Sequence, residues 1–210
     1  ILLNLRDQPH RVEGLDAIVD LAGENVASGA WSDAKKRAIR ESRGPRVRRF
    51  VEALAALDQP PRIYLCASAV GYYGDTGSEI VDESNLVDSE LFLADVTRDW
   101  EAAAETARCF AERVVNLRLG VVLSPRGGAL AKLMMPGAGP LVVPGDGRQL
   151  VSWIAVGDVA ASILHLLARD DASADGAINL TAPTPVSMAN LVDTLGRVTG
   201  RPVLAHVPEK

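Results

Sequence analysis

The 210-residue sequence has few of the side chains that bind metals or form disulfide frameworks. It contains two cysteines and three histidines, without a Cys-x-x-Cys pair or a ligand-like histidine spacing. These counts and spacings argue against a metal site and against a secreted domain held together by disulfide bonds. Cys66 and Cys109 each lie in an apolar context, so we expect two buried free thiols in a reducing compartment.

Long apolar runs and an excess of positive charge are also absent. No run reaches about 18 residues, so no membrane span is predicted. The net charge of -5 and the isoelectric point of about 5.2 argue against nucleic acid as a partner. No signal peptide is visible and the chain lacks an initiator Met. We therefore expect a soluble, cytoplasmic protein, and a fragment or a processed chain.

One stretch does gather positive charge. We expect it to form a solvated helix face, with an anion or partner site as the alternative. Its members are Lys35, Lys36, Arg37, Arg40, Arg43, Arg46, Arg48 and Arg49.

A short apolar segment, 63–67, has the character of a buried parallel strand. Small residues follow it, and then Tyr72 and Tyr73. Ligands of open α/β sheets bind beyond the carboxyl ends of such strands. Ser68 and the two tyrosines are therefore candidate site residues. The structural alternatives are a plain small residue at Ser68 and loop packing for the tyrosines.

Strand-like and helix-like segments alternate along the chain, which predicts an α/β fold with a mainly parallel sheet. Expected strands are 16–21, 63–67, 113–119, 141–143, 151–155, 177–180 and 203–207. Expected helices are 32–42, 47–57, 91–111, 129–134, 156–168 and 187–199. We expect a single domain, 1–210, in which about 124–150 and 181–210 form a smaller substrate lobe. The acidic segment 75–90 is interpreted as solvated surface, with a lid as the alternative.

Four motifs together resemble one known superfamily. They are Asp-Leu-Ala-Gly at 20–23, Ala-Ser-Ala-Val-Gly-Tyr-Tyr-Gly at 67–74, Leu-Arg-Leu-Gly-Val-Val-Leu at 117–123, and Gly-Asp-Gly-Arg-Gln at 145–149, which runs on to 153–160. The set is similar to extended short-chain dehydrogenases/reductases, and to their atypical branch called epimerase family proteins. Putative nucleoside-diphosphate-sugar epimerase is a common label for that branch.

The resemblance implies a Rossmann-like, doubly wound parallel sheet that binds NADP(H), with NAD(H) as the alternative. It also implies three segments beside the cofactor. Their residues are Leu21, Ala22, Gly23, Ala67, Ser68, Leu119, Gly120, Val121 and Val122.

Two departures concern the cofactor and the catalytic acid. The superfamily's Gly-x-x-Gly-x-x-Gly turn, which holds a pyrophosphate on backbone N–H groups, is absent from this sequence. Either the protein extends upstream or the chain holds a dinucleotide poorly. The superfamily's Tyr-x-x-x-Lys pair is absent too. The matching region of this chain, 92–96, is Phe-Leu-Ala-Asp-Val, and no tyrosine follows Tyr73. Ser68, Tyr72 and Tyr73 remain as catalytic candidates.

A third departure concerns the substrate. Sugar-nucleotide members carry a diphosphate-clamping Arg where this chain has Val151. Arg148 and Trp153 are our substrate-binding candidates. The expected function is hydride transfer between nicotinamide and a small hydroxyl or carbonyl substrate. The alternative is an inactive nucleotide-binding regulator or sensor.

Overall fold

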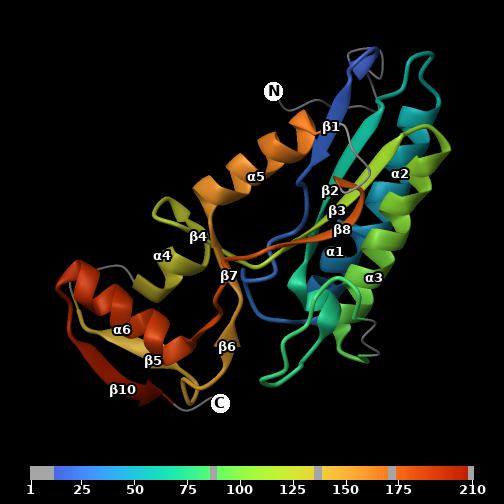
Figure 1. Ribbon diagram of the computed structural model, residues 1–210. Coiled ribbons are helices and arrows are strands. Elements are labelled where there is room, and N and C mark those ends of the chain that lie inside the picture. The colour runs from blue at the N-terminus through green and yellow to red at the C-terminus, as the bar shows by residue number, and fades with distance from the viewer. Residues whose placement is uncertain (1–11, 86–88, 135–138, 170–173, 208–210) are drawn as a thin grey trace. The chain divides into compact units, whose positions relative to one another are not determined.

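The computed structural model describes residues 12–85, 89–134, 139–169 and 174–207 (Figure 1). The chain divides into two compact units. The first unit comprises Ile1–Asp75, Val81–Arg118 and Ile163–Asn179, and the second comprises Thr76–Ile80, Leu119–Ser162 and Leu180–Lys210.

A four-stranded sheet forms the centre of the first unit. Its strands are β1 (Ala17–Asp20), β2 (Ile63–Ala69), β3 (Arg113–Leu119) and β8 (Gly176–Leu180), in the order β1-β2-β3-β8. β1 and β2 are parallel, and Ala17 lies opposite Ile63. The interiors of β2 and β3 are buried throughout, as both faces of a covered parallel strand must be. The predicted α/β, Rossmann-like fold is confirmed.

Helices cover this sheet. They are α1 (Asp33–Glu41), α2 (Gly44–Ala55) and α3 (Phe92–Glu105), with short 3-10 turns η2 (Val70–Tyr73) and η3 (Thr106–Cys109). α2 and α3 lie side by side on one face (Figure 1). α1 begins where predicted, because the Ser32 side chain accepts a hydrogen bond from the backbone N–H of Lys35.

The second unit consists of short strand pairs and helices. The parallel pairs are β4 (Val121–Ser124) with β7 (Trp153–Ala155) and β5 (Leu141–Pro144) with β10 (Val203–Val207), and the antiparallel pair is β6 (Leu150–Val151) with β9 (Val186–Ser187). The helices are α4 (Gly128–Met134) and α6 (Met188–Thr199), while α5 (Val156–Ala168) has residues in both units. A buried hydrophobic cluster of the second unit consists of Leu141, Val143 and Val192.

Three expectations need correction. Cys109 is exposed, because it lies in the turn η3 rather than within a helix. The helix predicted over 91–111 ends at Glu105, where the 3-10 turn η3 follows α3. β2 continues to Ala69, two residues beyond its predicted end. The polar residue Ser68 follows the apolar run, yet its side chain is buried within the strand. No helix within the described segments is both long and apolar enough to cross a membrane.

Close backbone packing in the second unit leads to a stability prediction. A Cβ at Gly196 of α6 would lie 2.6 Å from Val203 Cγ2 and 2.9 Å from the Arg201 carbonyl oxygen. A Cβ at Gly157 of α5 would meet nothing within 4 Å. We expect Gly196→Ala to lower the free energy of unfolding by about 1–3 kcal/mol, as overpacking does. The matched Gly157→Ala variant should not be destabilised. Urea unfolding measures both, and equal midpoints would contradict the packing.

Candidate functional site

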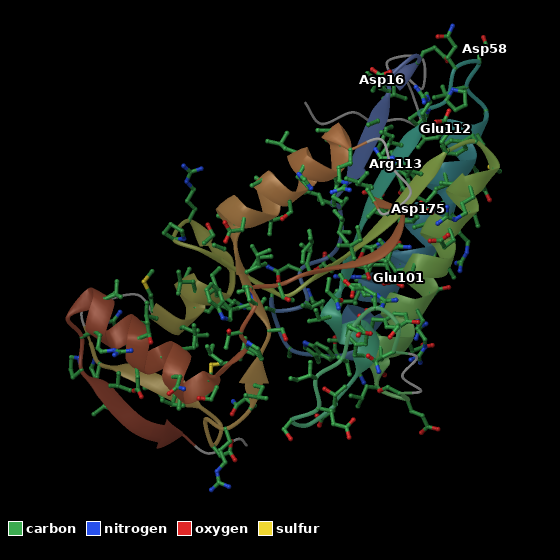
Figure 2. The ribbon with its side chains drawn as sticks, viewed as in Figure 1. Asp16, Asp58, Glu101, Glu112, Arg113 and Asp175 are labelled. Carbon is green, nitrogen blue, oxygen red and sulfur yellow. The ribbon has the colours of Figure 1, made fainter. Side chains whose placement is uncertain are left out.

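A buried ion pair joins α3 to the sheet of the first unit. Arg118 of β3 donates from Nε to Glu101 Oε1 and from Nη2 to Oε2, each at 2.9 Å. The Ser68 hydroxyl of β2 donates to the same Oε1 at 2.5 Å. Both charged residues are at most 8% exposed. Figure 2 labels Glu101 on its helix. Ser68 therefore faces α3, and its proton is directed to the Glu101 carboxylate.

Both tyrosines of η2 contact the Arg118 guanidinium. Arg118 Nη1 donates to the Tyr73 hydroxyl at 2.9 Å, and that hydroxyl donates to Asn179 Oδ1 at 2.8 Å. The guanidinium carbon lies 3.5 Å from the centroid of the Tyr72 ring, a stacked cation–π contact. The structure thus brings all three predicted catalytic residues to one ion pair: Tyr72 and Tyr73 contact Arg118, and Ser68 contacts Glu101.

The alternation of β3 explains where this network forms. Asn116 and Arg118 are two residues apart, so they point to the same face of the strand. Glu101 and Glu105 are one helical turn apart on α3 and face them. Asn116 Nδ2 donates to Glu105 Oε1 at 2.8 Å, beside the Glu101–Arg118 pair. Helix and sheet therefore meet here through paired polar groups, although the buried Asn116 Oδ1 has no hydrogen-bond partner among the described residues.

Glu101 keeps Arg118 charged in this interior. Burial by itself would lower the pKa of the guanidinium, but hydrogen bonds to Glu101 and Tyr73 outweigh burial and raise that pKa. The cation is thus permanent at any ordinary pH.

A second polar cluster fixes the loop after β1. Buried Asp20 accepts hydrogen bonds from the Tyr64 hydroxyl at 2.9 Å, from Arg46 Nη2 at 2.8 and 2.9 Å, and from the Ala22 backbone N–H at 3.2 Å. Arg43 Nη2 donates to the Glu24 carbonyl at 3.1 Å. The predicted cofactor loop, 21–23, is therefore held at both ends, while its own residues are exposed.

Most of the basic cluster is committed to partners within the first unit. Five of its eight members bond to acidic side chains or carbonyl groups: Lys35 to Glu24, Arg40 to Asp95, Arg43 to Glu24 and Ile39, Arg46 to Asp20, and Arg48 to Asp99. The cluster mainly ties α1 and α2 to neighbouring segments.

The other predicted residues are spread over both units. Ala67 is buried in β2 of the first unit, whereas the segment from Leu119 to Val122 belongs to the second unit. A Cβ at Gly120 would lie 2.8 Å from the Ser152 carbonyl oxygen, which explains the glycine. In the second unit, the Arg148 side chain is 91% exposed. Trp153 is half-buried, and its Nε1 has no hydrogen-bond partner among the described residues.

Sequence reasoning missed Glu101, Arg118 and Asn179. A signal existed for Arg118, because a charged residue two positions after Asn116 in a buried strand requires a partner. The identity of that partner could not be read from spacing. In the described segments, no three His, Cys, Asp or Glu side chains are grouped as metal ligands.

Comparison with known proteins decides the family. The family model described as "NAD dependent epimerase/dehydratase family" matches residues 3–181. This chain belongs to the NAD dependent epimerase/dehydratase family. It is 38% identical over 203 residues to epimerase family protein Mb2239 of Mycobacterium bovis, covering 95% of this chain and 65% of that protein. It thus spans slightly less than two thirds of that relative.

Solved structures agree with this assignment. Human epimerase family protein SDR39U1 (isoform 2), determined with NADPH, matches with a TM-score of 0.81 and 30% identity, covering 92% of this chain and 65% of that one. UDP-glucuronic acid 4-epimerase from Bacillus cereus matches with a TM-score of 0.79 over 97% of this chain and 66% of that one, but at 17% identity it supports the fold alone. The resemblance to epimerase family proteins is therefore confirmed.

The ion pair leads to a second stability prediction. Glu101→Gln keeps the side-chain shape but leaves the Arg118 charge buried without a counter-ion. We expect the free energy of unfolding to fall by roughly 3–5 kcal/mol, as when a buried pair is broken. Glu112→Gln is the matched control, because its pair with Arg62 is exposed and should contribute little. Chemical denaturation measures both, and equal small losses would show that the Glu101 pair is dispensable.

The Cys66 thiol leads to a pH prediction. Burial raises its pKa to about 12, and the Asp20 carboxylate adds to the shift. Its ordinary value is about 8.5. The folded protein therefore keeps the thiol proton to a higher pH than the unfolded chain does. The resulting contribution to the free energy of unfolding is complete below the ordinary pKa and is lost as the pH rises towards 12. Between about pH 8 and pH 10.5, the unfolding free energy should fall less in Cys66→Ala than in the wild type. Exposed Cys109→Ala is the control, and three parallel declines would contradict the assignment.

Proposed function

We propose that this protein binds NADP(H) and transfers hydride between the nicotinamide and a small hydroxyl or carbonyl substrate. The observation that carries the proposal is the network around Arg118. The hydroxyl of Tyr73 and the ring of Tyr72 contact this buried cation, and the Ser68 hydroxyl donates to the Glu101 carboxylate that is paired with it. The network lies towards the carboxyl ends of β2 and β3, where ligands of open α/β sheets bind. The NADPH in the human SDR39U1 structure supports the choice of cofactor.

The loop after β1 fits the cofactor's adenosine half. Leu21 is 53% exposed, which leaves an apolar side chain available to a planar ring. Ala22 and Gly23 add almost no bulk, so a ligand can approach the backbone closely. Hydrogen bonds from Ala22 to Asp20 and from Arg43 to the Glu24 carbonyl hold this loop ready for binding.

When bound, the nicotinamide supplies hydride chemistry, and the protein supplies orientation and a proton. In this proposal the η2 tyrosines hold the proton exchanged with the substrate oxygen. The Glu101–Arg118 pair orients them and keeps positive charge where negative charge develops. Ser68, which is 2% exposed, acts through Glu101.

The second candidate is a nucleotide-binding regulator without catalysis. The absence of Tyr-x-x-x-Lys from the sequence favours it. Hydride exchange between labelled NADPH and a panel of carbonyl compounds separates the candidates. Binding without exchange of label would favour the regulator.

NADPH fluorescence titration tests the proposed site. It should be run on this chain and on a form extended upstream, and the form that binds is then used for variants. Gly23→Val places a branched side chain in the loop and should weaken binding about tenfold or more, or about 1.4 kcal/mol. Gly157→Val, a substitution into open space on α5, is the control. If neither form binds NADPH, the proposal fails. If Gly23→Val binds like the wild type, the cofactor lies elsewhere.

A further inference from the structure

The neighbouring tyrosines of η2 differ in the freedom of their hydroxyl groups. Tyr73 is 3% exposed, and its hydroxyl accepts from Arg118 and donates to Asn179. An arginine can only donate, so the Tyr73 proton must point to the Asn179 carbonyl oxygen. Tyr72 is half-buried, and no hydrogen bond of its hydroxyl occurs among the described residues. The Tyr72 proton is thus the available one.

Arg118 fixes the Tyr72 ring without engaging its hydroxyl. The guanidinium carbon lies 3.5 Å from the Tyr72 centroid but 5.1 Å from the Tyr73 centroid. The two rings meet edge to face at 5.5 Å, so Tyr73 supports Tyr72 from the side. Glu101 holds the guanidinium in its plane through two parallel hydrogen bonds. A lysine could not supply this stacked, forked geometry.

We propose that Tyr72 exchanges the proton with the substrate oxygen, and that Arg118 is its positioning cation. Tyr73 and Glu101 are positioning residues that hold Arg118. This inference rests on the proposed function and deepens it. Since the carboxylate of Glu101 balances the charge of Arg118, the interior can hold a cation beside the phenol although the usual lysine is absent.

In the reduction of a carbonyl compound, Tyr72 gives one proton to the substrate oxygen. A bound NADPH would supply the hydride to the carbonyl carbon, and the C=O π pair would move onto oxygen. That oxygen takes the Tyr72 proton, and the phenolate regains a proton from water. Arg118 lies over the ring on which negative charge develops, where a fixed cation stabilises the transition state.

Nitration tests the assignment without cofactor. The chain has three tyrosines, and the other one, Tyr64, is fully buried. Tetranitromethane should modify Tyr72 in the folded protein and all three in urea, as located by peptide mass spectrometry. A Cys109→Ala background avoids oxidation of the exposed thiol. Modification of Tyr73 as fast as Tyr72 would overturn the inference.

Kinetics of the NADPH-binding form test the proton role. Tyr72→Phe keeps the ring and should lower kcat by roughly 10²–10⁴-fold, with NADPH affinity and melting temperature nearly unchanged. Tyr73→Phe should instead lower the melting temperature, because it leaves Asn179 without a donor. Arg118→Lys should lower kcat more than it raises KM. Loss of turnover in Tyr73→Phe alone, at wild-type stability, would reverse the assignment.

The two proposals fail in different ways. If the wild type neither binds NADPH nor exchanges label, the proposed function is wrong, and nitration still decides which phenol is free. If the wild type turns over and Tyr72→Phe does too, only the Tyr72 inference is wrong.

Discussion

The buried Glu101–Arg118 ion pair is the interaction on which the candidate site depends. Two charges are removed from water here, which is costly unless every polar atom finds a partner. The pair meets this demand through two parallel hydrogen bonds to each other and further bonds from Ser68 and to Tyr73. Each of these contacts joins a different element, so β2, α3, β3 and η2 are locked in one relative position. The Glu101–Arg118 pair therefore fixes both the packing of these elements and the arrangement of the candidate site residues.

This arrangement gives a physical account of the missing Tyr-x-x-x-Lys pair. A catalytic phenol in this superfamily needs a fixed cation nearby. In our proposal that cation is Arg118 of β3 instead of a lysine on the helix that follows β2. Glu101 on that helix balances its charge in the interior.

The loop 21–23, where we propose that the cofactor's adenosine half binds, depends on a second buried acid, Asp20. It gathers Tyr64, Arg46 and the Ala22 N–H at the end of β1. The same helices that carry the basic cluster thereby fix the loop 21–23 and leave its surface open. Three members of the basic cluster, Lys35, Arg43 and Arg46, bond to residues of this loop or next to it and so help to pre-organise it. Pre-organisation reduces the entropy lost when a ligand binds.

The sequence by itself determined the α/β fold, the family and most element positions. The bounds of β3, α5 and β10 match the predicted ranges. In α5 a 3.6-residue apolar period defines the helix locally, and in the two strands β-branched and leucine residues favour an extended chain. Ser32 and Ser187 begin their helices as predicted, since a cap acts within three residues.

Only the tertiary structure decided which side chains meet. Glu101, Arg118 and Asn179 come from three elements, and no local pattern pairs them. Tyr72 and Tyr73 are adjacent and chemically identical, so the sequence could not separate them. Their environments differ because Arg118 contacts the ring of one and the hydroxyl of the other. Long-range packing, which depends on the whole fold, sets that difference.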